Sequence, residues 1–333
     1  MTSIVTRPFD LQIVAPSALA EADWQARSTA PGVTYANDFR DPTRVTPFFF
    51  ANLGDPVLGF ISLDTTDGVT GGGCLRIITP TTYSGANSAV FRHPLNSAWT
   101  QNSQSFGNTP FWFSWRMKIN AGRLVPSTPG AGWKYYNLAQ FSVSDGGASG
   151  QSNTTAEIVG QDTYQRGFPQ AYHQDGNSYP PFEESFSWPG DTTDFKEQNA
   201  VDNDPTGSLG LDYPNRFCLY STSGMSPPFP GCWKWAVEEW MAFKVRVVFG
   251  TYGGSAGNQF DMWAAHKDAT QWTHTHSFQN FTLGVPQSGY SGSNGLHWHI
   301  YETGRVSSTQ DATVKWDQII VSTNDIALPA VGA

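Results

Sequence analysis

The sequence predicts an all-β fold with long loops, and its composition carries that prediction. Only 14% of the residues are charged, whereas 14% are aromatic, with 13 Trp among them. The chain also has 33 Gly and 22 Pro, which are turn formers. Globular proteins typically carry about 25% charged residues. Few charges, many rings and abundant turn formers are typical of β-rich proteins and disfavour helix bundles and disordered chains.

Two segments show the alternation that is typical of half-buried strands. In residues 111–119, FWFSWRMKI, the apolar positions alternate with Trp112, Ser114, Arg116 and Lys118. Residues 240–250, WMAFKVRVVFG, alternate in the same way, with Lys244 and Arg246 on the second face. We therefore expect one face of each strand in the core. The Trp at position 112 predicts that the other face lines a groove.

Shorter apolar runs between turn signals complete the strand set. We expect these strands at residues 57–63, 74–78, 138–143, 156–161, 260–265, 296–301 and 313–322. Residues 1–33 are predicted to form an N-terminal arm with a short helix over 17–27, and residues 34–333 a single β domain. The arm either covers its own domain or holds a neighbouring subunit.

Charge and the first residues limit the location and the partners. A net charge of −9 without a basic cluster disfavours nucleic acid as a partner. No signal peptide and no membrane-spanning run are visible. Exposed Trp and Tyr on an acidic β protein are typical of glycan-binding surfaces and of protein interfaces. We therefore expect a location on a virion, or outside the cell after lysis, unless a signal has been removed.

The segment 157–173, EIVGQDTYQRGFPQAYH, is the strongest candidate for a functional site. It combines a carboxylate at Glu157, a carboxamide at Gln161 and a guanidinium at Arg166, and it ends on the pair Tyr172-His173. These groups hydrogen-bond polyhydroxylated or acidic ligands, and several can transfer protons. The pattern is compatible with a binding surface, with a catalytic site, or with a structural strand followed by a polar loop.

The cysteines and one acidic loop leave alternatives open. Cys218 and Cys232 bracket a Pro- and Gly-rich loop that a disulfide could close, whereas Cys74 lies in an apolar strand and is expected to be a buried thiol. Asp202 and Asp204 begin a calcium-loop pattern that lacks its closing Glu, so no cofactor is expected.

One histidine pair and one tryptophan pair also have more than one interpretation. The pair His274 and His276 has metal-ligand spacing without a nearby third ligand, which favours an exposed loop. Trp233 and Trp235 fit either a sugar platform or the core.

Four segments resemble the concanavalin A-like lectin and glucanase superfamily. They are residues 37–39 (NDF), 239–250 (EWMAFKVRVVFG), 260–265 (FDMWAA) and 314–322 (VKWDQIIVS). The resemblance spans roughly residues 35 to 325 and is strongest to lyase-like jelly rolls of the alginate and heparin lyase type and to phage-encoded relatives. It implies an antiparallel β-sandwich, or jelly roll, whose concave sheet holds the ligand.

The resemblance also implies where a glycan would bind. The lyases carry a Tyr/His pair with Gln or Asn and Arg on the concave sheet. The matching ligand-binding candidates here are Glu157, Arg116, Gln140, Arg246, Lys244, His297, His299 and Tyr301. For lyase chemistry, His173 or His299 would be the base, Tyr172 or Tyr301 the acid, and Arg166, Gln161 or Arg246 would neutralise the carboxylate.

Two functions from different classes remain. The first is a glycan-binding jelly roll on a phage virion, docked to capsid or tail proteins through residues 1–33. The second is a polysaccharide lyase that cleaves an acidic polysaccharide by β-elimination. A hydrolase is disfavoured because the Glu-x-Asp-x-x-Glu strand that supplies paired carboxylates in retaining glucanases is absent from the sequence. The missing lyase signatures favour the binding module.

Overall fold

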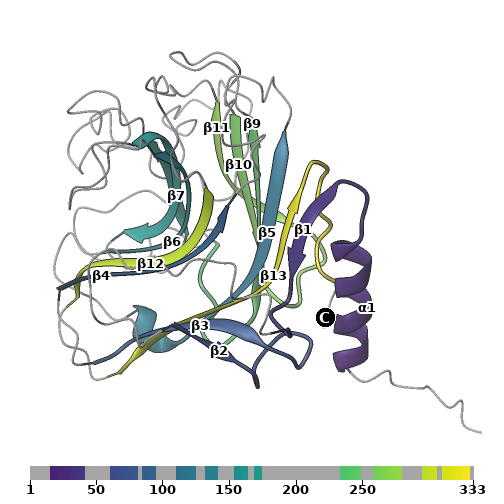
Figure 1. Cartoon of the computed structure of the whole chain (residues 1–333), viewed down its shortest axis with the longest axis horizontal. Helices are drawn as coiled ribbons and strands as arrows, with labels where there is room; N and C mark the ends of the chain where they lie inside the picture. Colours follow the sequence, from purple (N-terminus) through teal and green to yellow (C-terminus); the bar gives the residue numbers. More distant parts are fainter. Residues whose placement is uncertain are drawn as a thin grey trace, which may run out of the picture.

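The computed structural model is a β-sandwich of two antiparallel sheets with an α-helix packed outside it (Figure 1). The structure describes residues 16–41, 61–81, 85–94, 110–124, 132–141, 154–163, 169–174, 233–248, 257, 259–279, 295–305 and 310–330. Within these residues, α1 (Pro16–Ser28) is an α-helix and η4 (Ala121–Leu124) is a short 3-10 helix. The predicted all-β jelly roll is confirmed.

Sheet A has eight strands and contains both strands that show strong alternation. Its order is β11-β10-β9-β5-β13-β3-β2, and β1 also pairs with β13. The strands are β1 (Val33–Asn37), β2 (Ile61–Asp64), β3 (Cys74–Thr79), β5 (Phe111–Ile119), β9 (Met241–Val248), β10 (Gln259–Ala265), β11 (Thr273–Gln279) and β13 (Ala312–Ser322). The sheet therefore joins strands from both ends of the chain.

Sheet B has five strands in the order β4-β12-β6-β7-β8. Its strands are β4 (Gly85–Pro94), β6 (Gly132–Phe141), β7 (Thr154–Thr163), β8 (Gln170–Gln174) and β12 (Gly295–Arg305). Figure 1 shows that these strands curve, with the convex side toward sheet A and the concave side away from it. We call the latter the concave face of sheet B.

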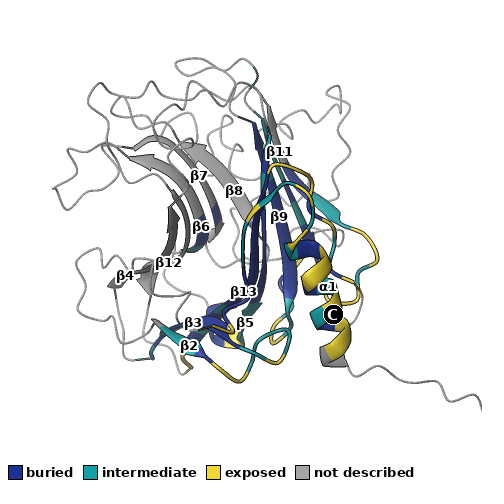
Figure 2. Ribbon diagram, turned by 45° about the vertical axis from the view of Figure 1, so that its right-hand side comes forward, coloured by how far each residue is buried: buried dark blue, intermediate teal, exposed yellow. Residues whose placement is uncertain are grey.

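The core between the sheets is built mainly from rings. On β5, the predicted inward set is buried, with Phe113 and Met117 fully so, and β9 buries Phe243 and Val245 in the same way. The Trp115 ring lies 5.3 Å from that of Phe243, nearly parallel to it. The predicted faces of both strands are therefore confirmed, and Figure 2 shows the buried strands of sheet A in dark blue.

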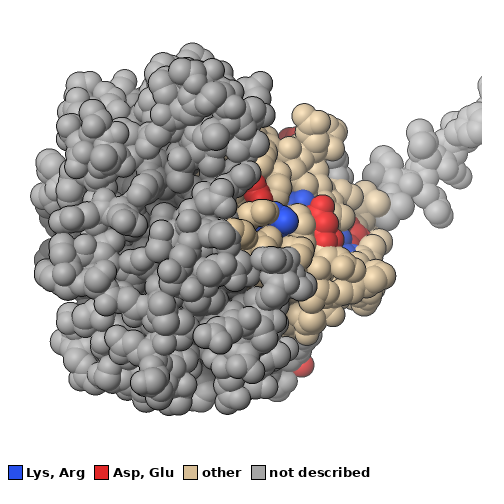
Figure 3. Space-filling model, turned by 90° about the horizontal axis from the view of Figure 1, so that it is seen from above, with Lys and Arg blue, Asp and Glu red and all other residues tan. Residues whose placement is uncertain are grey.

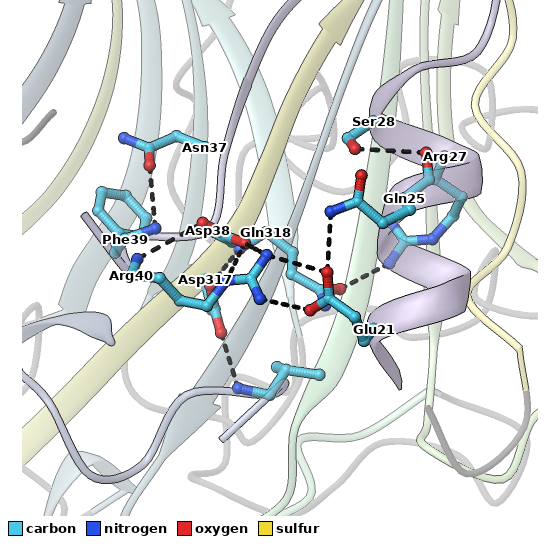
Figure 4. Close-up of polar contacts among 11 residues, drawn as sticks. Glu21, Gln25, Arg27, Ser28, Asn37, Asp38, Phe39, Arg40, Asp317 and Gln318 are labelled. Carbon is cyan, nitrogen blue, oxygen red and sulfur yellow. Dashed lines mark hydrogen bonds and ion pairs between the residues drawn. The ribbon is translucent and has the colours of Figure 1, made fainter. Parts of the chain in front are cut away.

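The arm residues in α1 pack on the outer side of sheet A. Trp24 is buried in a small apolar cluster with Ile320 and Ile326. Arg27 donates a part-buried hydrogen bond to Asp23 within the helix, 2.8 Å, and a buried one to the side-chain oxygen of Gln318 on β13, 2.6 Å. Figure 4 shows the link between Arg27 and Gln318.

A second network ties the same helix to the segment after β1. Arg40 binds Glu21 and Asp38, and Gln25 donates to Glu21 at 2.8 Å. Polar contacts therefore attach α1 to its own domain, in addition to the apolar packing of Trp24.

Several strands differ from the expected boundaries, and one expected loop is a strand. The strand expected at 138–143 begins at Gly132, and β4 and β8 were not expected at all. The prediction of an exposed loop at His274 and His276 is wrong, because both lie in β11. The register shifts between Met262 and Trp263, so His276 pairs with Met262 and His274 with Trp263, and Thr275 is the extra residue. The extra residue interrupts the alternation of inward and outward positions along β11, so the sequence pattern of a strand is not visible there.

The described residues contain no helix that is both long enough and apolar enough to cross a membrane.

Candidate functional site

Tyr136 on β6 fixes which side of sheet B faces the core. Its side chain is fully buried, and its ring lies 5.6 Å from Phe113 and 5.2 Å from Trp115 of β5 in sheet A. Burial also raises the pKa of its phenol well above the usual value, so the group is neutral. Residues directly opposite one another on antiparallel strands share a face. We call a set of residues that pair with one another across the sheet a row. The row that contains Tyr136 faces the core, so the rows on either side of it lie on the concave face.

The first concave-face row contains Lys134. In order across the sheet, the row consists of Tyr301 on β12, Lys134 on β6, Gln161 on β7 and Gln170 on β8. The Lys134 side chain is partly exposed, whereas its neighbours Trp133 and Tyr135 are fully buried. Neighbouring strands lie about 4.8 Å apart. Lys134, which carries an ammonium group, therefore lies between the positions of Tyr301, a phenol, and Gln161, a carboxamide.

A bulge in β6 creates this arrangement. Tyr135 and Tyr136 are consecutive but both fully buried, and the register shifts between Lys134 and Tyr136. Opposite them, Gly160 leaves the space that the two rings fill, because a Cβ there would lie 2.0 Å from Cε1 of Tyr136. The extra residue shifts the alternation by one position, so that Lys134 lies on the concave face although Tyr135 and Tyr136 are both buried; β-bulges next to functional sites commonly redirect side chains in this way.

A second concave-face row crosses all five strands of sheet B. It runs from Arg92 on β4 through His297, Asn137 and Val159 to Tyr172 on β8. A third row contains Glu157 opposite Gln174. Strand alternation adds the position of His299, between His297 and Tyr301. Positions in the predicted segment 157–173 and the predicted set on β12 therefore lie on the same face of one sheet.

Two predicted residues occupy positions on the other face. His173 pairs with Ile158, whose row continues to Leu138. Gln140 lies two residues beyond Leu138, on the Tyr136 side. The register therefore separates His173 from Tyr172, although they are adjacent in sequence.

Three predicted cations do not lie in sheet B. Arg116 on β5 is 3% exposed, and burial lowers its pKa to about 10. Arg246 on β9 forms an ion pair with Asp261 at 3.1 Å. Lys244 is also buried, and its ammonium lies 4.8 Å from the centre of the Trp263 ring. All three alternate with core residues, so they lie on the outer face of sheet A, away from the concave face.

The outer face of sheet A is a structural cluster in which charges and rings satisfy one another. Lys244 contacts the rings of Trp112, Trp263 and Trp272, and it pairs with Asp325 at 2.7 Å. His274 stacks on Trp263 with the ring centres 4.6 Å apart. In the described surface, acidic and basic side chains lie close together (Figure 3). The Trp that predicted a groove belongs to this cluster.

Four described residues for which the sequence left alternatives, Trp233, Trp235, Cys74 and His276, are buried structural residues. Trp233 and Trp235 are 7% exposed and belong to the main core. Burial raises the pKa of the Cys74 thiol to about 12, which keeps it protonated. Burial lowers the pKa of His276 to about 3. Among the described residues, no three His, Cys, Asp or Glu side chains cluster in a way that could hold a metal ion. Arg166, Asp202, Asp204, Cys218 and Cys232 lie outside the described residues.

Sequence reasoning missed Lys134, Asn137 and Arg92. A signal for the first two was present, because WKYYNLAQF is rich in aromatic residues that favour strands and contains the polar positions 134 and 137. The expected strand began only at residue 138. Arg92 carries no comparable local signal, since its place depends on the pairing of β4 with β12.

Comparison with known proteins supports the fold. No protein-family model matches the chain, and no curated protein matches it. Among solved structures, the marine PL-14 alginate lyase from Aplysia kurodai is 13% identical, covers 89% of this chain and 100% of its own, and has a TM-score of 0.51. The alginate lyase Aly36B is 8% identical, with 90% and 100% covered and a TM-score of 0.42. The catalytic domain of a GH131 β-glucanase from Podospora anserina is 10% identical, with 86% and 87% covered and a TM-score of 0.37.

The two-sheet architecture and the likeness to the Aplysia enzyme show the jelly-roll fold. The neighbours are carbohydrate-active proteins, and alginate lyases are among them. At 13% identity the likeness to the Aplysia enzyme establishes the fold alone, because one fold hosts many activities.

Proposed function

We propose that this protein binds an acidic polysaccharide on the concave face of sheet B. The observation that carries the proposal is the row Tyr301–Lys134–Gln161–Gln170, which crosses four adjacent strands. Lys134 supplies a positive charge in a protein whose net charge is −9. An ammonium pairs with a carboxylate, while phenol and carboxamide groups hydrogen-bond hydroxyls. This combination favours a uronic acid polymer over a neutral glycan.

The test is equilibrium binding of alginate oligosaccharides, with neutral dextran fragments as the comparison. Lys134→Gln keeps much of the side chain and removes the charge. A hydrogen bond to a charged group contributes about 1.5–3 kcal/mol, so the variant should bind the acidic ligand at least tenfold more weakly. Lys118→Gln is the matched control, because it removes the same charge from β5 of sheet A, outside the concave face of sheet B. Equal affinity for dextran, or unchanged binding by Lys134→Gln, would refute the proposal.

A second candidate function is cleavage of that polysaccharide by β-elimination. It is favoured by the positions of His299 and Tyr301, which lie two residues apart on the same face of β12, beside Lys134. In this reaction a base removes the C5 proton of the uronic acid, the C4–O bond breaks, and a C4=C5 double bond forms. His299 would be the base and Tyr301 would protonate the leaving oxygen, while Lys134 and Gln161 neutralise the carboxylate.

Catalysis can be tested separately from binding. The unsaturated product absorbs ultraviolet light, so absorbance should rise when wild-type protein is incubated with polyuronates. Tyr301→Phe removes only the phenolic hydroxyl. It should abolish that rise, whereas the loss of one neutral hydrogen bond should weaken alginate binding about tenfold at most. Binding without any rise in absorbance across alginate, heparin and other polyuronates would refute the lyase and leave the binding module.

The virion location is proposed from the sequence. The acidic charge and the N-terminal arm support it, and the partners would be capsid or tail proteins that contact residues 1–33. The described part of the arm packs on its own domain through Trp24, so docking would rely on the residues before α1. Mass spectrometry of purified particles should detect the protein in stoichiometric amounts. Its absence from the particles would refute this location.

A further inference from the structure

A buried carboxyl group, that of Asp317, joins β13 to the connection between β2 and β3. The Asp317 side chain is fully buried. One of its carboxyl oxygens accepts a hydrogen bond from the backbone N–H of Val69, 2.7 Å, and the other accepts one from the backbone N–H of Gln318, 2.6 Å. Asp317 belongs to sheet A, so neither the proposed binding nor the proposed cleavage uses its carboxyl group.

The backbone around this carboxyl group has an uncommon conformation. Gln318 has a φ of 49°, and Phe39, in the segment that follows β1, has a φ of 54°. Residues other than glycine rarely adopt positive φ, and they do so where the surrounding structure imposes it. At Gln318 the strand bulges, because the register between β13 and β5 shifts between Asp317 and Ile320. The connection between β2 and β3 is in close backbone contact with the same region, since a Cβ at Gly73 would lie 2.2 Å from the carbonyl oxygen of Phe39.

The side chain of Gln318 connects this bulge to helix α1. Its oxygen accepts the 2.6 Å hydrogen bond from Arg27 (Figure 4). Gln318 is 1% exposed, and within the described part of the chain its side-chain nitrogen has no hydrogen-bond partner. Buried polar groups are normally hydrogen-bonded, so Arg27 is the contact that compensates the burial of this amide. The docking of α1 therefore depends on the position of the residue directly after Asp317.

Charged and titratable groups from each neighbouring element surround Asp317. Those that act on it directly are Arg116 opposite it on β5, Asp38 after β1 and Cys74 on β3. Next to Cys74 lie Asp64, Asp67 and Lys315, and next to Arg116 lie Arg27, Asp23 and Glu239. Burial raises the pKa of the Asp317 carboxyl group to about 8; the two backbone donors and Arg116 oppose this rise, and Asp38 adds to it.

We propose that the Asp317–Gln318 bulge couples the charge of one buried carboxyl group to the docking of α1 and of residues 65–73 on sheet A. A protonated carboxyl group is neutral and is tolerated at this buried position. Once it is ionised, a buried negative charge faces Asp38 as well as Arg116, so an opening that admits water becomes more favourable. The segments that open are those that contact the bulge, residues 65–73 through Val69 and α1 through Gln318. This inference is independent of the proposed glycan binding.

Opening should become easier as the pH rises toward 8. The folded-state pKa of Asp317, about 8, lies above the usual 3.8, so between these values the closed state binds the proton more tightly than the open state. The stabilisation of the closed state is fully present below pH 3.8 and is lost as the pH rises through 8. The opening equilibrium should therefore grow by up to about tenfold per pH unit within this window and level off above it.

The experiment is hydrogen-deuterium exchange of the full chain from about pH 5 to about pH 10, corrected for the intrinsic pH dependence of amide exchange. In the wild type, peptides from 16–28 and 65–73 should lose protection up to about pH 8. Asp317→Asn keeps the shape without the titration and should remove this pH dependence. Asp311→Asn is the matched control, because Asp311 also accepts a backbone N–H, that of Thr81 at 2.8 Å, but is exposed; it should leave the pH dependence unchanged.

A second variant tests the path from the bulge to the helix. Gln318→Met keeps the length of the side chain and removes the oxygen that Arg27 binds. It should preserve the pH dependence in 65–73 and remove it from 16–28. A pH dependence that persists in 16–28 of this variant would overturn the coupling to α1.

Two results would overturn the whole proposal. One is wild-type protection in 65–73 that does not change with pH, and the other is an unchanged pH dependence in Asp317→Asn. Infrared difference spectra of the wild type provide a readout that does not require this variant to fold. Between about pH 6 and about pH 10 the band of a protonated carboxylic acid should disappear, and the absence of such a band at the lower pH would also refute the proposal.

Discussion

Gly160→Ala tests whether the β6 bulge organises the site. The added Cβ would lie 2.0 Å from Cε1 of Tyr136 and 2.8 Å from Cε2 of Tyr135. Both rings are fully buried, and that of Tyr136 is held between Phe113 and Trp115, so it cannot move aside without displacing the core. Overpacking of this kind typically costs about 1–3 kcal/mol. We expect the upper end of that range, because the contacts are with rigid rings.

The assay is guanidinium denaturation followed by tryptophan fluorescence, combined with a double-mutant cycle. Tyr136→Leu lacks the atom that clashes and should be destabilising alone, since it leaves a cavity. In the double variant Gly160→Ala/Tyr136→Leu, the new methyl group partly fills that cavity. The two losses in unfolding free energy should therefore sum to at least about 1 kcal/mol more than the loss measured for the double variant. Additive losses within about 0.5 kcal/mol would refute the steric account.

Two further predictions concern stability away from the site. The folded-state pKa of His276, about 3, lies below the usual 6.5, so its contribution is present above pH 6.5 and is lost as the pH falls toward 3. His276→Phe should flatten that part of the pH dependence of the unfolding free energy; an unchanged slope would contradict the assignment. Arg27→Met removes the ion pair with Asp23 and the buried hydrogen bond to the side-chain oxygen of Gln318, and it should cost about 3 kcal/mol. Hydrogen exchange should then quicken in α1 first, and uniform quickening across both sheets would argue against a local role in docking the helix.

The two long alternating strands were predictable because their signal is local. Residues 111–119 and 241–248 separate core from non-core positions by simple alternation, and each strand has one fully buried face. β11 escaped prediction because its bulge at Thr275 breaks that alternation. The start of β6 escaped for a related reason, since two consecutive buried tyrosines do not alternate.

The candidate site was only half predictable, because face and sheet membership depend on long-range pairing. Tyr172 and His297 share a row through β6 and β7, and nothing local to either residue indicates this. Arg116 and His299 looked alike as polar residues on alternating strands. The pairing of β5 with β13 and β9 assigns the first to sheet A, while the pairing of β12 with β4 and β6 assigns the second to sheet B.

The most direct test of the central claim is hydrogen-deuterium exchange with and without a saturating uronic acid octamer. Binding to the concave face predicts slower exchange in peptides from 132–141, 154–163 and 295–305, with no change in 259–279 of sheet A. Protection confined to 259–279 and the other strands of sheet A, with sheet B unchanged, would contradict the account.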